Sequence, residues 1–342
     1  MKGIILAAGK GTRMAPLTDR RAKPLVPLLG RPMIEHIISG GAAAGVNDWI
    51  IVVGPFREQV TAHLGDGAQL GVRIRYVVQQ VANGNGAATL LCEEYIRDDP
   101  FLVSFGDIMT HPGNYPRLVE QLSSGNWDTV ITLNYVDDPY EGAAVYVDGS
   151  RVRKIIEKPP RGTSTTNFNN SGVFGFTPII FDMIRTTPVS ERGEYELTQA
   201  VGTMVDRGRP VGAIALDGYW SDVARPRDIL KLEPMMLLAA APPDGILIDP
   251  SAQVAEGAEL LGPIMVGPGA AVGASAVGPN ASIGAEAQVG DDCTLTDCAI
   301  LARASVGARS RLSRVLVEEG VHVPAGTQIG GPEDACRIIE RE

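Results

Sequence analysis

Residues 1–14 read MKGIILAAGKGTRM, which is the most informative stretch of the sequence. The apolar run at residues 3–7 is typical of a buried strand, and the glycine-rich turn at residues 9–13 follows it directly. Because glycine lacks a Cβ, backbone amides in such a turn can approach an anion closely. Arg13 and, ten residues later, Lys23 add two cations. A strand, a tight turn and two cations together predict a site for phosphate groups.

Two better-known phosphate-binding motifs are excluded. A P-loop requires a lysine and a serine or threonine after its last glycine, whereas Gly11 is followed by Thr12 and Arg13. A dinucleotide-binding fingerprint requires a third glycine at position 14, which is Met14. The glycines taken alone also fit a plain strand-to-helix turn, and Arg13 with the Lys23-Pro24 segment argues against that interpretation.

Strand and helix patterns alternate over the first 241 residues. Strand patterns cover residues 3–7, 49–53, 72–78, 101–105, 128–136, 145–147, 152–156, 171–176 and 211–216. Helix patterns cover residues 31–44, 56–64, 86–96, 194–207 and 226–240. This alternation predicts an α/β domain with a mostly parallel sheet that helices cover.

Beyond the linker at residues 242–245 the periodicity changes. Aliphatic residues recur every six positions, with three five-residue steps, at Ile248, Val254, Leu260, Val266, Val272, Val277, Ile283, Val289, Leu295, Ile300, Val306, Leu312, Val317, Val323 and Ile329. Such hexapeptide periodicity predicts a parallel β-helix of roughly five coils with these side chains inside. We therefore expect domains at 1–241 and 242–332, with a C-terminal tail at 333–342.

Composition excludes several classes of protein. A net charge of −10 argues against non-specific electrostatic binding to nucleic acid or to an anionic membrane. The four cysteines lack the spacing of a zinc, redox or disulfide framework, so we expect buried free thiols. The N-terminal apolar run is too short for a secretory signal, and no stretch approaches a membrane span. These features predict a cytoplasmic protein.

The segment LAAGKGTRM with the downstream KPLVP resembles the sugar-1-phosphate nucleotidylyltransferases, and the resemblance extends through the C-terminal repeats. It implies a Rossmann-like nucleotidyltransferase domain with a mixed, mostly parallel sheet, followed by a left-handed β-helix. The family joins a nucleoside triphosphate to a sugar 1-phosphate, releases pyrophosphate and requires Mg²⁺. The expected partners are therefore these two substrates, together with further copies of the chain packed through the β-helix.

This reaction needs no covalent enzyme intermediate, so catalysis is positioning and charge stabilisation. The resemblance implies that Arg13 holds the β- and γ-phosphates and that Lys23 lies between the α-phosphate and the sugar phosphate. Asp107, in Phe-Gly-Asp after a strand, and Asp222, in Gly-Tyr-Trp-Ser-Asp, are the expected metal ligands. Solvated surface cations and helix-capping aspartates are the alternative interpretations of these residues.

The resemblance also implies the nucleotide-binding residues, namely Leu6, Ala7, Gly9, Gly11, Thr12, Gln79 and Gly84. Gln79 can pair edge-on with a pyrimidine amide, which favours UTP or dTTP. An exposed glutamine at a strand end is the alternative interpretation. A GTP- or ATP-specific version of the reaction remains open, as does a non-catalytic regulatory subunit that binds a nucleotide sugar.

On the sugar side, the residues implied by the resemblance are Gly142, Ala143, Glu157, Lys158 and Asn170. Three positions depart from the family pattern. Ala22 replaces the proline that commonly precedes the lysine, Asn85 replaces a threonine, and Gly142-Ala143 replaces Tyr-Gly. These departures leave the reaction class unchanged and leave the acceptor open between a sugar phosphate and a sugar-like cyclitol phosphate. Some relatives carry an acetyltransferase in the β-helix, but only His322 is available here as a base.

Overall fold

The computed structural model describes residues 1–330 and 336–340. The chain forms two compact units. The first contains Met1–Lys10, Ala22–Pro24 and Ile34–Asp222. The second contains Gly11–Arg21, Leu25–Met33 and Val223–Glu342. The glycine-rich segment that begins at Gly11 thus belongs to the same unit as the hexapeptide repeats.

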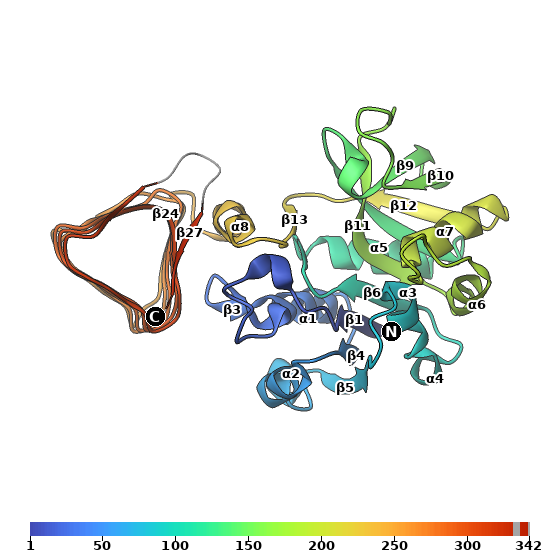
Figure 1. Cartoon of the computed structure of the whole chain (residues 1–342), viewed down its shortest axis with the longest axis horizontal. Helices are drawn as coiled ribbons and strands as arrows, with labels where there is room; N and C mark the ends of the chain where they lie inside the picture. The colour runs from blue at the N-terminus through green and yellow to red at the C-terminus, as the bar shows by residue number, and fades with distance from the viewer. Residues whose placement is uncertain (331–335, 341–342) are drawn as a thin grey trace. The chain divides into compact units, whose positions relative to one another are not determined.

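A nine-stranded sheet forms the centre of the first unit (Figure 1). Its order is β5 (Arg73–Val78), β4 (Asp48–Val53), β1 (Lys2–Ala7), β6 (Phe101–Phe105), β11 (Phe168–Phe176), β8 (Thr129–Tyr135), β12 (Val211–Ala215), β10 (Arg151–Glu157) and β9 (Ala143–Asp148). Only β11 and β10 run against the other seven strands. The prediction of a mixed, mostly parallel sheet is therefore confirmed.

Helices cover both faces of this sheet (Figure 1). They are α1 (Met33–Ala43), α2 (Arg57–Leu64), α3 (Asn85–Leu90), α4 (Glu93–Ile96), α5 (Asn114–Ser123), α6 (Ile179–Thr186) and α7 (Leu197–Asp206), with 3-10 turns at Ala68–Leu70 and Pro139–Glu141. Residues of α3, α6 and α7 pack with the strands in one buried cluster that includes Ala88, Ile180 and Val201. Sequence patterns did not identify α5 and α6.

Three predicted helices differ from the structure by more than one residue. The helix expected from residue 31 begins at Met33, because Arg31–Pro32 pairs as β3 with β2 (Pro27–Leu28). The helix expected at 86–96 is divided into α3 and α4. The helix expected from residue 194 begins at Leu197, because Tyr195 is hydrogen-bonded to the chain at Asn83 and Gly86 instead.

A short two-stranded ribbon completes the first unit. It pairs β7 (Ile108–Thr110) with β13 (Trp220–Asp222) in antiparallel register. The indole N–H of Trp220 donates to the carbonyl oxygen of Ser171 at 2.9 Å, which ties the ribbon to β11. The ribbon matters because the two expected metal ligands lie at the same end of it.

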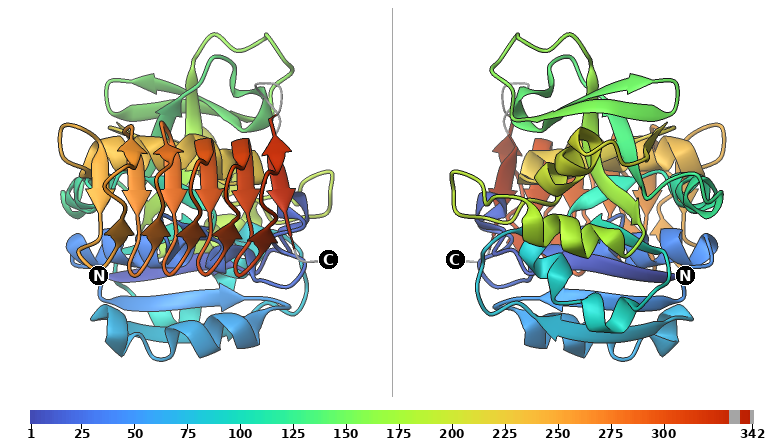
Figure 2. Two further views of the ribbon diagram at one scale, coloured as in Figure 1. Left: turned by 90° about the vertical axis from the view of Figure 1, so that its left-hand side faces the viewer. Right: turned by 90° about the vertical axis from the view of Figure 1, so that its right-hand side faces the viewer.

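In the second unit a parallel β-helix follows α8 (Pro226–Ala240), and it is seen end-on as a triangle in Figure 1. The first face contains β14 (Ile246–Ile248), β17 (Ile264–Val266), β20 (Ala281–Ile283) and β27 (Arg337–Ile339). The second face contains β15 (Gln253–Val254), β18 (Ala271–Val272), β21 (Gln288–Val289), β23 (Ser305–Val306) and β25 (His322–Val323). The third face contains β16 (Glu259–Leu260), β19 (Ala276–Val277) and β26 (Gln328–Ile329). The longer β22 (Thr294–Ile300) and β24 (Arg311–Val317) each contribute to both the first and third faces. Figure 2 shows the coils as a ladder of parallel strands.

Burial confirms the hexapeptide register, and the coil matches the left-handed β-helix expected from it. The repeat positions from Val266 to Val323 are all buried, whereas Ile248 in the first coil is 42% exposed. End positions are less buried because no further coil covers them. Part of the predicted tail, Arg337–Ile339, forms β27 and pairs with β24, whereas tail residues 333–335 and 341–342 lie outside the described residues.

The expectation of buried free thiols is confirmed for Cys92, Cys293 and Cys298, whereas Cys336 is partly exposed. Burial raises the pKa of Cys92 and of Cys298 to about 12. None of the helices in the described ranges combines the length and the apolar character of a membrane span.

Candidate active site

The carboxyl edge of the parallel strands brings together residues from three parts of the sequence. Ala7 ends β1 in register with Val53 at the end of β4. The N–H of Gln79 donates to the carbonyl oxygen of Val53 at 2.9 Å, so Gln79 continues this row beyond β5. On the other side of β1, the N–H of Gly106 donates to the carbonyl oxygen of Leu6 at 3.0 Å. Ligands of open α/β sheets bind at this edge.

Asp107 follows Gly106 and forms a short ion pair at this edge. Lys23 Nζ donates to Asp107 Oδ2 at 2.6 Å, and the Lys23 side chain is 10% exposed. Asp222 pairs in register with Ile108, the residue after Asp107. The structure therefore brings the expected catalytic lysine and the two expected metal ligands to one end of the β7–β13 ribbon.

Asp107 and Asp222 are the two carboxylates expected as metal ligands at this end of the ribbon. No group of three or more His, Cys, Asp or Glu side chains with metal-site geometry occurs among residues 1–330 and 336–340. A pair of hard oxygen ligands is typical of Mg²⁺ sites that are completed by substrate phosphates and water.

The expected base-side residues also lie together. Gln79 Nε2 donates to the carbonyl oxygen of Gly84 at 3.2 Å and to Asn83 Oδ1 at 3.4 Å. Gly84 has φ +108°, and a Cβ there would lie 2.4 Å from the carbonyl oxygen of Tyr195, so a side chain is excluded for two reasons. The turn between β5 and α3 thus fixes the side chain of Gln79.

The five expected sugar-side residues meet where β9, β10 and β11 adjoin. Glu157 pairs in register with Ala143, and the N–H of Lys158 donates to the carbonyl oxygen of Gly142 at 2.7 Å. Asn170 Nδ2 donates to Thr198 Oγ1 at 3.0 Å, and Asn170 Oδ1 accepts from the N–H of Gly172 at 3.3 Å. These contacts orient the amide of Asn170 before any ligand binds.

Gly142 is required by its neighbour Asn169. A Cβ at Gly142 would lie 2.0 Å from Asn169 Oδ1. That oxygen accepts the N–H of Ala143 at 2.9 Å, and Asn169 Nδ2 donates to Asn134 Oδ1 at 3.0 Å. The Gly142-Ala143 departure from the family pattern is therefore accommodated by a buried asparagine pair.

A charged group that sequence patterns did not identify lies beside Glu157. Desolvation of its carboxylate raises the pKa of Glu157; Lys158 opposes the shift, Glu196 adds to it and Arg192 opposes it. Arg192 in turn pairs with Glu196 and lies 3.4 Å from Glu194. The segment before α7 thus adds an arginine and two carboxylates to the sugar side.

The loop after Lys10 has its own internal structure within the second unit. Gly11 has φ +69°, and its carbonyl oxygen accepts the N–H of Met14 at 2.8 Å and the hydroxyl of Thr18 at 2.8 Å. Thr12 and Arg13 begin the 3-10 turn Thr12–Met14 and are exposed to solvent. Gly9 has no heavy atom within 4 Å of the position of a Cβ.

The two other departures from the family pattern also have structural reasons. The N–H of Ala22 donates to Gln59 Oε1 at 2.8 Å, a bond that proline could not make. Asn85 Oδ1 accepts the N–H of Leu197 at 2.6 Å, so this side chain reaches the start of α7.

Comparison with protein families gives two matches along the chain. The nucleotidyl transferase family matches residues 2–237, and the GlmU-like C-terminal hexapeptide family matches residues 250–337. Together they cover both the sheet domain and the β-helix.

Named relatives cover the chain to different extents. A glucose-1-phosphate thymidylyltransferase of Streptomyces griseus is 30% identical over 346 residues, which is 96% of this chain and 95% of the relative. A low-salt glycan biosynthesis nucleotidyltransferase of Haloferax volcanii is 33% identical over 239 residues, 69% of this chain and 66% of the relative. The bifunctional protein GlmU of Methanocaldococcus jannaschii is 33% identical over 79% of this chain, and the match spans 61% of that relative.

A solved structure from Bacillus anthracis, provisionally assigned as a glucose-1-phosphate thymidylyltransferase and bound to sucrose, has the same fold in part. It matches with a TM-score of 0.63 and 29% identity, over 68% of this chain and 94% of the neighbour.

Proposed function

Because this chain belongs to the nucleotidyl transferase family, whose match covers residues 2–237, we propose that it transfers a nucleotidyl group from UTP or dTTP to a sugar 1-phosphate or sugar-like phosphate, with release of pyrophosphate. It is an enzyme of the sugar-1-phosphate nucleotidyltransferase class.

The observation that carries the proposal is the contact between Lys23 and Asp107. Lys23 Nζ lies 2.6 Å from Asp107 Oδ2 at the carboxyl edge of the sheet, next to the strand that bears Asp222. A buried cation at this edge suits a reaction in which one phosphate attacks another, because both like-charged groups must be held close together.

In this reaction the sugar-phosphate oxygen attacks the α-phosphorus in line and the bond to pyrophosphate breaks. Lys23 neutralises charge on the α-phosphate and the attacking phosphate, which offsets their repulsion. Arg13 binds the β- and γ-phosphates and stabilises the charge that builds up on the leaving pyrophosphate. No side chain needs to act as a covalent nucleophile.

Asp107 and Asp222 would hold Mg²⁺ with oxygen ligands, and their backbone positions at one end of the β7–β13 ribbon are compatible with that role. When bound, the ion neutralises triphosphate charge and aligns the α-phosphate. Lys23 keeps the Asp107 carboxylate oriented through the bond at 2.6 Å.

The base is proposed to bind beside Ala7, Gln79 and Gly84, at the carboxyl edge of the sheet. Gln79 presents an amide, whose donor and acceptor can match the edge of uracil or thymine. The relative from Streptomyces griseus, a thymidylyltransferase that aligns over 95% of its length, favours dTTP among the two.

The sugar is proposed to bind between Glu157, Asn170 and the Gly142-Ala143 turn, with Lys158 at its phosphate. A carboxylate with a raised pKa and a pre-oriented amide are suited to hydroxyl groups. Arg192, in the segment before α7, is a further cation on this side.

The test is a matrix of UTP, dTTP, GTP and ATP against several sugar 1-phosphates, with pyrophosphate release as the readout. We expect turnover with a pyrimidine triphosphate, dependent on Mg²⁺ and absent in Asp107→Asn. Absence of pyrophosphate release over the whole matrix, with nucleotide-sugar binding retained, would overturn the proposal in favour of a non-catalytic subunit. Light scattering of the same preparation tests the expected homo-oligomer.

A further inference from the structure

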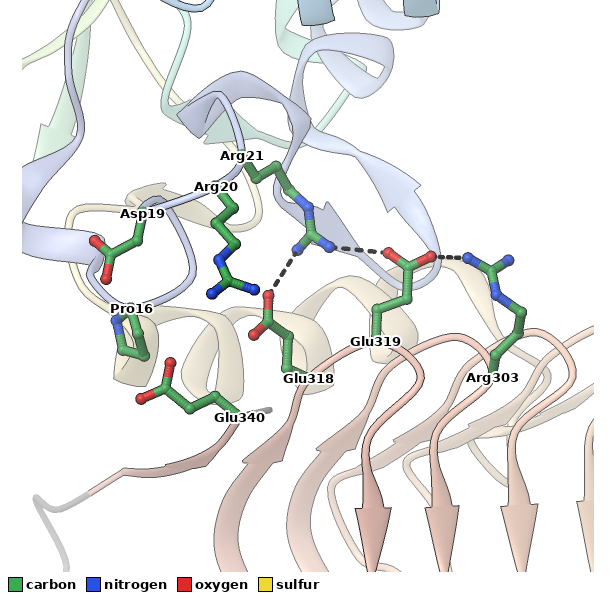
Figure 3. Close-up of a pocket in the computed structure, with 8 residues that line it drawn as sticks. All are labelled: Pro16, Asp19, Arg20, Arg21, Arg303, Glu318, Glu319 and Glu340. Carbon is green, nitrogen blue, oxygen red and sulfur yellow. Dashed lines mark hydrogen bonds and ion pairs between the residues drawn. The ribbon is translucent and has the colours of Figure 1, made fainter. Parts of the chain in front are cut away.

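The loop that carries Arg13 is tied to the β-helix at its last residue. Residues Gly11–Arg21 belong to the second unit together with the repeats. Arg21 Nη2 donates to Glu319 Oε2 at 2.9 Å, and Arg21 Nη1 lies 3.9 Å from Glu318 Oε1 (Figure 3). The Arg21 side chain is 19% exposed, so water screens these contacts only in part.

The two glutamates are held on a rigid support. They follow β24 in a turn whose N–H groups are bonded on both sides. The N–H of Glu318 donates to the carbonyl oxygen of Ile339 at 2.8 Å, and the N–H of Gly320 donates to that of Ala302 at 2.9 Å. Within the turn, the N–H of Val321 donates to the carbonyl oxygen of Glu318 at 3.1 Å. The backbone that bears these carboxylates is therefore fixed, so pairing with Arg21 requires ordering of the side chains alone.

The loop itself is folded as one piece. The Gly11 carbonyl oxygen accepts two hydrogen bonds, from the N–H of Met14 and from the hydroxyl of Thr18, and the N–H of Asp19 donates to the carbonyl oxygen of Pro16 at 3.0 Å. In the sequence Arg21 stands two residues before Lys23. Restraint at Arg21 therefore restrains the whole loop that bears Arg13.

We propose that Glu319, with Glu318 in a lesser role, is a positioning residue for the nucleoside triphosphate and acts through Arg21. The β-helix then affects nucleotide binding indirectly, through the loop at residues 11–21. The inference rests on the proposed function, because Arg13 is assigned there to the triphosphate. Glu319 leads because its contact with Arg21 is a hydrogen bond, whereas the contact of Glu318 is a longer ion pair.

A ligand site is the other interpretation of this region. A cavity of about 540 Å³ lies between these side chains and is lined by three arginines and four acidic residues (Figure 3). The acidic residues outnumber the arginines, and Arg303 also pairs with Glu319. An anion would have to displace carboxylates from the arginines that they already pair with. The lining therefore favours an internal contact of Arg21 with Glu318 and Glu319, which we call the clamp.

The clamp is tested with Arg21→Ala, Glu319→Ala and the double variant. We expect each single change to raise the KM for the triphosphate by about tenfold and to leave the KM for the sugar phosphate within about twofold. The double variant should be no worse than Arg21→Ala, because both changes remove one interaction. Arg21→Lys should restore part of the loss. Arg303→Ala is the matched control, since it removes the 60% exposed partner of Glu319 and leaves Arg21 in place.

Amide hydrogen exchange of residues 11–21 without substrates provides a second readout. We expect faster exchange in Arg21→Ala and Glu319→Ala, and wild-type exchange in Arg303→Ala. Unchanged exchange, or a lower melting temperature with the triphosphate KM unaltered, would overturn the positioning role. If the wild-type protein turned over no substrate pair, the proposed function would fail while exchange still decided whether the clamp exists.

Discussion

The side chain of Asn85 and the backbone of Leu197 are joined by a hydrogen bond of 2.6 Å between Asn85 Oδ1 and the Leu197 N–H. Two backbone bonds flank it: the N–H of Gly86 donates to the carbonyl oxygen of Tyr195 at 2.8 Å, and the N–H of Tyr195 donates to that of Asn83 at 2.9 Å. The turn that holds Gln79 and the start of α7, beside the sugar-side residues, are therefore one hydrogen-bonded assembly.

Asn85→Ala should weaken this assembly. Leu197 is fully buried, and its N–H would lose its partner, which costs about 1–3 kcal/mol. We expect a lower free energy of unfolding in urea and a several-fold higher KM for the sugar phosphate. Asn85→Asp keeps the acceptor oxygen and is the control that should retain most of the stability. Equal stability of the wild-type and Ala variants would show that the bond contributes nothing.

Gly142→Ala should damage the sugar side selectively. The new methyl group would lie 2.0 Å from Asn169 Oδ1, so Asn169 must move and its bond to the Ala143 N–H would be lost. Overpacking of this kind costs about 1–3 kcal/mol. We expect a higher KM for the sugar phosphate and an unchanged KM for the triphosphate in steady-state kinetics. Gly149→Ala, in the exposed turn between β9 and β10, controls for general loss of turn stability. A rise in the triphosphate KM alone would contradict the assignment.

Asp107→Ala should abolish Mg²⁺-dependent turnover and leave the fold intact. The change removes a proposed metal ligand and the partner of Lys23 at 2.6 Å. We expect pyrophosphate release to fall by about 10³-fold or more, which is typical when a group that stabilises transition-state charge is lost. Circular dichroism should match the wild-type protein. Asp148→Ala, which removes an exposed carboxylate paired with Arg153, is the control and should retain activity. Normal turnover of Asp107→Ala would refute the metal assignment.

Gln79→Glu should reduce the preference for pyrimidine triphosphates. The substitution replaces the amide that donates to the Gly84 carbonyl oxygen at 3.2 Å with a carboxylate that repels it. It also removes the donor proposed for the base edge, at a cost of about 1.5–3 kcal/mol in binding. Competition between UTP, dTTP, GTP and ATP in one reaction measures this preference directly. An unchanged ratio of the four products would place the base elsewhere.

Sequence patterns predicted the parts of this molecule that depend on local repeats. The strands around Ala7, Val53 and Phe105 are apolar runs that are buried on both sides, and the hexapeptide register follows from one side chain pointing inward at each corner. The motif residues at the carboxyl edge could also be predicted, because a parallel sheet brings the ends of its strands to one edge.

What could not be predicted depends on contacts between distant segments. The helix expected from residue 194 starts three residues later because Tyr195 is paired with Asn83 and Gly86, more than 100 positions earlier. Arg192 and Glu196 carry no motif, and only the folding of their segment toward Glu157 brings them to the sugar side. The departures from the family pattern at Ala22 and Asn85 likewise depend on single hydrogen bonds to distant partners. Ala22 bonds to Gln59, and Asn85 bonds to Leu197.

Glu233 in α8 provides a test of stability in the second unit. Its side chain is buried; Oε1 accepts the N–H of Leu29 at 2.7 Å and Oε2 accepts the hydroxyl of Ser282 at 2.6 Å. Burial raises the pKa of Glu233 from 4.5 to about 6, although both hydrogen bonds oppose the shift. The folded protein therefore binds this proton more tightly than the unfolded chain does. This group's contribution to stability falls as the pH rises from 4.5 to about 6, and above that the buried charge costs about 2 kcal/mol.

Glu233→Gln should remove this dependence on pH. The neutral amide keeps an acceptor for the Leu29 N–H and offers a donor to the Ser282 hydroxyl, so both contacts can remain. Urea unfolding between pH 4.5 and 8 should show the variant more stable than the wild-type protein at pH 8, by up to about 2 kcal/mol, with the difference shrinking toward pH 4.5. Glu259→Gln, on the first coil and exposed, is the control and should show no such trend. A variant that is less stable than the wild-type protein at pH 8 would mean that the charged carboxylate bonds strongly enough to outweigh its burial.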